Sequence, residues 1–96
     1  MKPHNDRFIW DEKKHLSNIE KHGVSFIEAA SAFYDDNAVY IDDITHSQEE
    51  SRFVVIGKSD MMNMLMVCHC HRNGDSLIRL ISARKANKKE RVIYER

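Results

Sequence analysis

The spacing of hydrophobic residues along this 96-residue chain changes once, after Asp35 and Asp36. Before these aspartates, apolar side chains recur every three or four positions, which is typical of amphipathic helices. After them, apolar residues alternate with polar ones or stand in short blocks, which is typical of β-strands. The pattern therefore predicts helices in the first part of the chain and mainly strands in the second.

The first helix is predicted to run over residues 12–22. Asp11 is a favourable N-cap residue, and Gly23 is a common helix terminator because glycine adopts the left-handed backbone conformation without strain. Leu16 and Ile19 are expected to form a narrow apolar stripe that faces the core.

A second helix is predicted to follow almost at once. Ser25 and Glu28 have the S-x-x-E spacing of a capping box, in which each side chain bonds to the backbone of the other residue. The apolar residues that repeat on one side of this helix are Phe26, Ala29, Ala30 and Phe33. We expect this side to belong to the core.

Short segments with the composition of strands are found at residues 7–10, 38–42, 53–57, 65–71 and 77–81. With the helices, they predict an α+β fold in a single domain over residues 1–96, built on a small antiparallel sheet with two N-terminal helices and a C-terminal helix. The helices are expected largely on one face of the sheet. No apolar stretch reaches the ~18 residues of a membrane span, and the N-terminus lacks the apolar segment of a signal peptide, so a cytoplasmic protein is expected.

Two turns set the expected register of the sheet. If Asn73 and Gly74 are the central residues of a hairpin, Cys68 lies opposite Arg79. A five-residue loop over residues 59–63 would likewise place Arg52 opposite Cys70. Both arginines would then share one face, although an error of one residue in either loop would separate them.

The junction after the last strand is a candidate phosphate site. Ser82 is the expected N-cap of the C-terminal helix, and Arg79 and Arg84 flank it. Two guanidinium groups beside the free N–H groups of a helix start would suit an anion. The alternative is that this charged helix is an ordinary solvated surface.

Charge is segregated along the chain although the net charge is zero. Residues 28–50 contain seven acidic side chains and no Lys or Arg, whereas residues 79–96 contain seven basic and two acidic ones. A basic region of this kind suits a nucleic acid or an acidic partner.

Cysteine and histidine alternate from Cys68 to His71, which invites a metal-site interpretation. In a strand, however, the cysteines point to one face and the histidines to the other, so four ligands cannot converge. The sequence therefore predicts reduced structural cysteines, no metal site and no cofactor.

The loop between the strands at 38–42 and 53–57 is the richest polar run of the chain. It contains His46 and Glu50, and Arg52 follows. A histidine, a carboxylate and nearby arginines are what acid–base cleavage of a phosphodiester requires. The alternative is an ordinary solvated loop.

Three segments together resemble the BrnT family of bacterial type II toxins: IWDEKKHLSNIEKHGVSFIEA, DITHSQEESRFVVIG and IRLISARKANKKERVIYE. The resemblance implies a RelE-like ribonuclease fold and cleavage of RNA without a metal. It also implies neutralisation by a BrnA-like antitoxin that has a ribbon-helix-helix domain and binds operator DNA.

On this interpretation Arg52, Arg79 and Arg84 would hold the scissile phosphate, and His46 and Glu50 would be the candidate acid and base. Tyr94 is a further catalytic candidate that could instead anchor the last helix. The residues expected to follow the RNA backbone are Lys85, Lys88, Lys89 and Arg91. The alternative is a binding module that uses the same basic surface and cleaves nothing.

Overall fold

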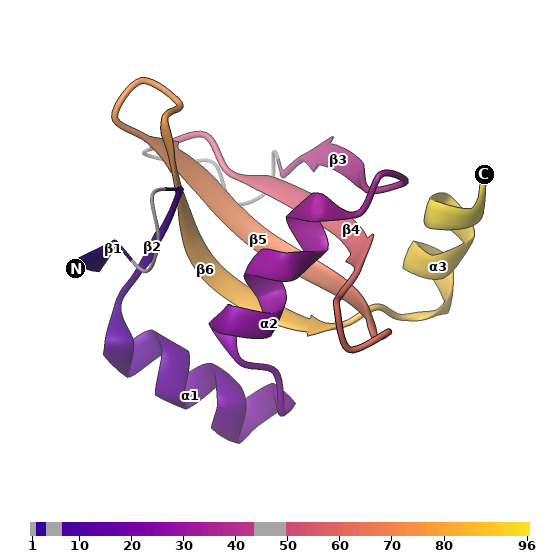
Figure 1. Cartoon of the computed structure of the whole chain (residues 1–96). Helices are drawn as coiled ribbons and strands as arrows, with labels where there is room; N and C mark the ends of the chain where they lie inside the picture. The colour runs from indigo at the N-terminus through magenta and orange to yellow at the C-terminus, as the bar shows by residue number, and fades with distance from the viewer. Residues whose placement is uncertain (1, 4–6, 44–49) are drawn as a thin grey trace.

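The computed structural model describes residues 2–3, 7–43 and 50–96. Its elements are β1 (Lys2–Pro3), β2 (Phe8–Trp10), α1 (Glu12–His22), α2 (Phe26–Ser31), the 3-10 helix η1 (Ala32–Tyr34), β3 (Val39–Asp42), β4 (Phe53–Lys58), β5 (Met64–Arg72), β6 (Leu77–Lys85) and α3 (Lys88–Glu95). This order confirms the predicted α+β fold (Figure 1).

The sheet has the strand order β1-β2-β6-β5-β4-β3. The stretch from β3 to β6 is antiparallel, as predicted. β2 joins the edge of β6 in parallel, with Phe8 opposite Ile78, so the sheet as a whole is mixed. The connection between β2 and β6 contains α1, α2, η1 and the strands β3 to β5, so it is long enough to allow a parallel pair.

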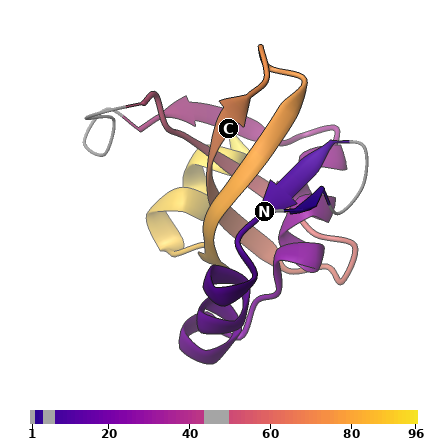
Figure 2. The same cartoon turned by 90° about the vertical axis from the view of Figure 1, so that its left-hand side faces the viewer.

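The helices lie on both faces of the sheet. Figure 2 shows α2 and α3 on opposite sides of it, and α3 contacts β4. The expectation that the helices lie largely on one face is therefore correct for the N-terminal helices and wrong for α3. The main core forms on the α2 side, from Phe8, Trp10, Val24, Phe26, Ala29, Ala30, Phe33, Val55, Leu65, Val67, Ile78, Leu80 and Ala83.

The start and end of α1 agree with prediction, but its buried face does not. Leu16 is 59% exposed and Ile19 is 40% exposed, so the expected apolar stripe is wrong. The buried residues of α1 are His15 and Asn18. The imidazole of His15 stacks on the ring of Phe26 at a centroid distance of 5.4 Å, so a polar ring fills the place expected for an aliphatic side chain.

The predicted capping box of α2 is formed only in part. The hydroxyl of Ser25 accepts a hydrogen bond from the backbone N–H of Glu28 at 3.0 Å. The carboxylate of Glu28 instead accepts hydrogen bonds from Ser59 Oγ at 2.7 Å and Asn63 Nδ2 at 2.8 Å. Glu28 thus ties α2 to the β4–β5 loop.

The β5–β6 hairpin has a longer turn than predicted. Arg72 pairs with Leu77 rather than Asp75, because Asn73, Gly74 and Asp75 all adopt positive φ angles and make a wider loop. The shift is two residues, so the faces of the strand are conserved. Cys70, rather than Cys68, lies opposite Arg79.

The last strand extends beyond its predicted end. β6 continues to Lys85, because the long strand β5 supplies partners up to that residue. Ser82 is therefore a strand residue opposite Cys68, and its predicted role as an N-cap is wrong. The N-cap of α3 is Asn87, which forms a complete capping box with Glu90.

Candidate functional site

A bulge in the β5–β6 ladder brings the predicted phosphate-binding residues of β6 to one face. Cys68 pairs with Ser82 and His69 with Leu80, so Ile81 is the extra residue on β6. Before and after the bulge, Arg79, Ser82 and Arg84 lie opposite Cys70, Cys68 and Met66, which alternate onto one side of β5. We call this side, away from the main core, the open face.

Glu50 is held on the open face by two arginines. Its Oε2 accepts a hydrogen bond from Arg72 Nη1, and its Oε1 lies 3.9 Å from Arg79 Nη1. The thiol of Cys70 donates to the same Oε1 at 3.5 Å. The hydrogen bond from Arg72 lowers the pKa of Glu50, so this side chain is a carboxylate at neutral pH. We refer to Glu50, Arg72 and Arg79 as the arginine–glutamate cluster.

Arg79 retains an unused donor in this cluster. Its Nε is buried and, among the described residues, has no hydrogen-bond partner. A buried N–H without a partner is costly, and such groups recur at sites that bind a ligand. The guanidinium of Arg79 is therefore not saturated by its ionic contact with Glu50, and part of the Arg79 side chain is exposed.

The two cysteines support the open face without offering a nucleophile. Both are free and buried. Burial raises the pKa of the Cys68 thiol and also that of the Cys70 thiol, so both stay protonated at neutral pH. A thiol needs the opposite shift to act as a nucleophile. This agrees with the prediction of reduced structural cysteines.

Arg84 lies on the open face but is occupied by another partner. Its guanidinium forms two hydrogen bonds of 2.8 Å with the carboxylate of Glu90. Along the sheet, Arg84 is displaced from Arg79 by the four positions from Met66 to Cys70, or roughly 13 Å. The prediction that Arg79, Ser82 and Arg84 gather around one phosphate at a helix start is therefore wrong, because the strand continues through all three.

Tyr94 is tied to the loop before β3. Its hydroxyl donates a hydrogen bond of 2.6 Å to Asp35 Oδ2. This bond raises the pKa of Tyr94, which makes its hydroxyl a weaker acid. The contact corresponds to the anchoring alternative for this residue.

The remaining predicted residues fall in different places. His46 lies outside the described residues. Arg52 directly precedes β4, and its carbonyl accepts a hydrogen bond from the N–H of Asp43 at 2.9 Å. The predicted RNA-binding side chains are all exposed on the end of β6 and on α3; they are Lys85, Lys88, Lys89 and Arg91.

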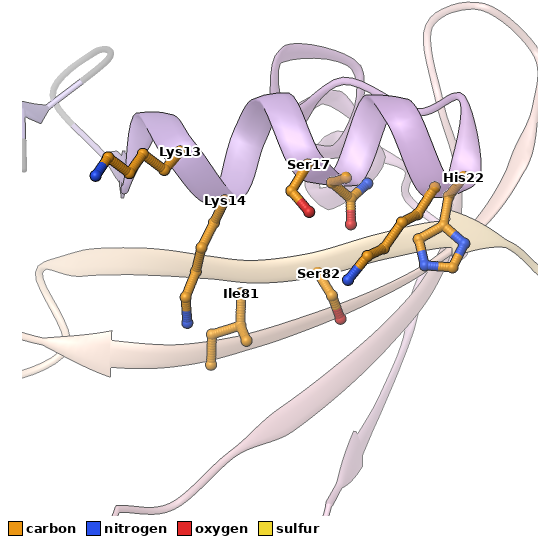
Figure 3. Close-up of a pocket in the computed structure, with 8 residues that line it drawn as sticks. Lys13, Lys14, Ser17, His22, Ile81 and Ser82 are labelled. Carbon is orange, nitrogen blue, oxygen red and sulfur yellow. The ribbon is translucent and has the colours of Figure 1, made fainter.

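The sequence interpretation missed a contribution from α1. The amide of Asn18 pairs with the backbone of β6: its Nδ2 donates to Ala83 O at 2.7 Å and its Oδ1 accepts from Ala83 N at 3.0 Å. Beside this contact, α1 and β6 enclose a groove of about 330 Å³ (Figure 3). We call it the α1 groove; it is lined by Lys13, Lys14, Ser17, Asn18, Lys21, His22, Ile81 and Ser82. The sequence signal that could have indicated this groove is the helical spacing of Lys13, Lys14 and Lys21 in α1.

Within residues 2–3, 7–43 and 50–96, no group of three or more His, Cys, Asp or Glu side chains is arranged to hold a metal ion. None of the helices in this part of the chain is long and apolar enough to cross a membrane.

Comparisons with known proteins identify the class of protein to which this chain belongs. The family model for the ribonuclease toxin BrnT of type II toxin-antitoxin systems matches residues 10–90. The chain belongs to this family, which confirms the resemblance seen in the sequence. Among solved structures, the fold is similar to the 1.1 Å crystal structure of the Brucella abortus ribonuclease toxin BrnT, with a TM-score of 0.64 and 24% identity over 88% of this chain and 100% of that one. Comparison with curated proteins gave no significant match.

Proposed function

We propose that this toxin is an endoribonuclease that cleaves RNA without a metal ion, and that the arginine–glutamate cluster on the open face binds the scissile phosphate. The family supports the activity on RNA. The position of Arg79 supports the site, because its Nη1 faces Glu50 while its Nε is buried without a partner in the described part of the chain. Guanidinium groups suit this role since they offer paired donors to phosphate oxygens.

Glu50 acts as a positioning residue in this proposal. A general base works best when its pKa lies near the working pH, whereas the hydrogen bond from Arg72 lowers the pKa of Glu50. A carboxylate of this kind is better suited to orienting Arg72 and Arg79 than to removing the proton of a ribose 2′-OH. His46, four positions earlier in the sequence, has a side chain whose ordinary pKa is close to neutral, and it is our candidate for proton transfer.

The charge that develops on the phosphate is met by arginine side chains in this mechanism. Arg79 provides the central contact, Arg72 bonds to the same Glu50, and Arg52 lies close enough to Cys68 to act on the pKa of its thiol. Arg84, roughly 13 Å along the sheet, would contact a different phosphate of the same strand through the N–H donors that its two bonds to Glu90 leave unused. The lysines and arginine of α3, with Lys85, would follow the RNA beyond that point.

We further propose that the partner is a BrnA-like antitoxin with a ribbon-helix-helix domain, and that operator DNA is bound only through the complex. A type II system implies a protein antitoxin. The exposed basic side chains of α3 offer it an electrostatically favourable surface, where binding would also obstruct RNA.

The first prediction tests the role of Arg79. Replacing it with alanine should reduce the rate of RNA cleavage by about 10²- to 10³-fold, because one contact to the developing phosphate charge is lost. Glu50 keeps its hydrogen bond to Arg72, so the fold should be retained. The measurements are cleavage of a labelled RNA, with and without EDTA, and the melting temperature of the same preparation.

The matched control is Arg96→Ala, which removes an exposed arginine that has no assigned role. It should leave cleavage and melting unchanged. A large fall in the melting temperature of Arg79→Ala, with activity proportional to the folded fraction, would make Arg79 a structural residue. Loss of wild-type cleavage in EDTA would rule out the metal-free mechanism, and binding of RNA without any cleavage would favour the non-catalytic module.

A further inference from the structure

The α1 groove has the properties of a second contact surface for nucleic acid. We propose that it binds the sugar-phosphate backbone of single-stranded RNA next to the phosphate held by the arginine–glutamate cluster. This inference rests on the proposed function, since it extends the path of the same RNA from the arginine–glutamate cluster to α1. This helix lies near the N-terminus of the chain, whereas the basic helix α3 lies near the C-terminus.

The charge of the groove is the first argument. Lys13, Lys14 and Lys21 line it together with His22, and no carboxylate lines it. Within the described residues, none of the three lysines forms an ion pair. Unpaired lysines around a groove that lacks acidic side chains create a positive potential, which attracts a polyanion.

The shape of the groove favours a chain rather than a small anion. The lysines are spread along α1 over two turns, so their ammonium groups do not converge on a single point. Figure 3 shows Lys14 directed from α1 toward β6, with Lys13 and His22 at opposite ends of the helix. Ser17 and Ser82 add hydroxyl groups between these charges. Distributed point charges with hydroxyl donors suit a phosphate backbone that passes along the helix.

The groove is continuous with the open face, which is the second argument. Ser82 lines the groove and lies opposite Cys68 in the sheet, and Cys68 is two positions from Cys70, the partner of Arg79. This corresponds to about 7 Å along the strand. Burial and the charge of Asp43 raise the pKa of the Cys68 thiol, and Arg52 and Lys14 are close enough to oppose this rise. An RNA strand in contact with Arg79 would therefore lie next to the side of the groove that Ser82 lines.

The α1 groove also has a rigid wall. The amide of Asn18 is buried and bonds to Val24 O at 2.9 Å as well as to both backbone groups of Ala83. These bonds hold the backbone of α1 against β6 and so position the part of the helix from which the lysines project. Asn18 is a positioning residue here and is not expected to contact RNA.

The second prediction is the test of this proposal. The probe is a fluorescent 2′-O-methyl RNA oligonucleotide, which cannot be cleaved through its 2′-OH. The variant is Lys13→Ala with Lys21→Ala, both exposed, so folding should be unaffected. We expect about tenfold weaker binding, and a salt dependence of log K that is less steep by about 1.4, because each lysine that contacts a phosphate of a single strand contributes about 0.7.

The matched control is Lys58→Ala, which removes an exposed lysine at the far end of β4. It should change neither the affinity nor the salt slope. Equal effects of the control and the double variant, or no effect of either, would overturn the groove as an RNA site. Because binding is measured on a probe that is not cleaved, this result is independent of whether the wild-type protein proves to be a nuclease.

Discussion

At the scale of single residues, Gly57 of β4 lies close to the backbone of η1. A Cβ atom at this position would lie 2.6 Å from the carbonyl oxygen of Ala32, which is well inside van der Waals contact. The obstacle is a backbone atom of η1, so it cannot move aside as the end of a flexible side chain would. Glycine at this position allows β4 to pack directly beneath η1.

The third prediction follows from this contact. Gly57→Ala should lower the free energy of unfolding by roughly 1–3 kcal/mol, because β4 and η1 must move apart. Chemical denaturation is the measurement, and Ser51→Ala, at an exposed position just before β4, is the control. Equal stability of Gly57→Ala and the wild type would mean that η1 shifts at no cost.

The buried polar residues of α1 show why hydrophobic spacing failed there. Asn18 can be buried because Ala83, 65 positions later in the chain, supplies a donor and an acceptor for its amide. Nothing within the helix itself reveals such a partner. Leu16 and Ile19 had the expected spacing for a core stripe, but the tertiary contact with β6 rotates them toward solvent.

At the scale of elements, α3 is held mainly by its two ends. None of its residues is buried. At its start, the carboxylate of Glu90 bonds to both Arg84 and the backbone N–H of Asn87. Near its end, Tyr94 bonds to Asp35. A short helix without a buried face depends on such contacts, since its intrinsic stability is low.

The fourth prediction concerns the contact near the end of α3. Tyr94→Phe removes only the hydroxyl that bonds to Asp35, so amide hydrogen exchange in α3 should accelerate, by a factor that corresponds to about 1 kcal/mol. RNA cleavage should persist if Tyr94 is an anchor. Tyr34→Phe is the matched control, because Tyr34 is exposed. A loss of cleavage without faster exchange would restore Tyr94 as a catalytic candidate.

The sequence predicted the existence of the elements better than their ends. The β4–β5 register was predicted correctly, with Lys58 opposite Met64, because the loop length fixes it. The β5–β6 register was displaced because an Asn-Gly pair does not distinguish a two-residue turn from the wider loop observed. The bulge at Ile81 has no sequence signal, and it arises only when both strands are paired.

At the scale of the whole molecule, one buried histidine links stability to pH. His69 is buried in the sheet, where its ring meets the edge of Phe33 at a centroid distance of 4.8 Å. Burial lowers the pKa of His69 from 6.5 to about 4. The folded protein therefore keeps this ring neutral over a pH range in which the unfolded chain takes up a proton.

The fifth prediction is a loss of stability in mild acid. The contribution of His69 is complete above pH 6.5 and decreases as the pH falls toward 4, with a total of about 3 kcal/mol. The free energy of unfolding should be measured between pH 7 and 4 for the wild type and for His69→Phe. The variant should show a flatter profile over this range. Parallel profiles would exclude His69 as the cause.

The arrangement of the candidate site was predictable only in part. The predicted face of Arg79, on which it contacts Glu50, is correct. The predicted hairpin register was displaced by two residues, and a shift of two preserves the faces of a strand. The position of Arg84 depended on where β6 ends, and that is determined by the length of β5. The lysines of α1 were not predicted as a site, because the basic residues of the chain are most concentrated in residues 79–96.

The pairing of Asn18 with Ala83 also has a consequence for self-association. Past Arg79, where the pairing with β2 ends, one side of β6 has no paired strand. An unpaired strand edge is a template on which another copy of a protein can add its own strand. The side-chain amide occupies the N–H and the C=O that such a strand would use at Ala83. One helix therefore shields this border from polymerisation, and it does so without covering the face on which RNA is expected to lie.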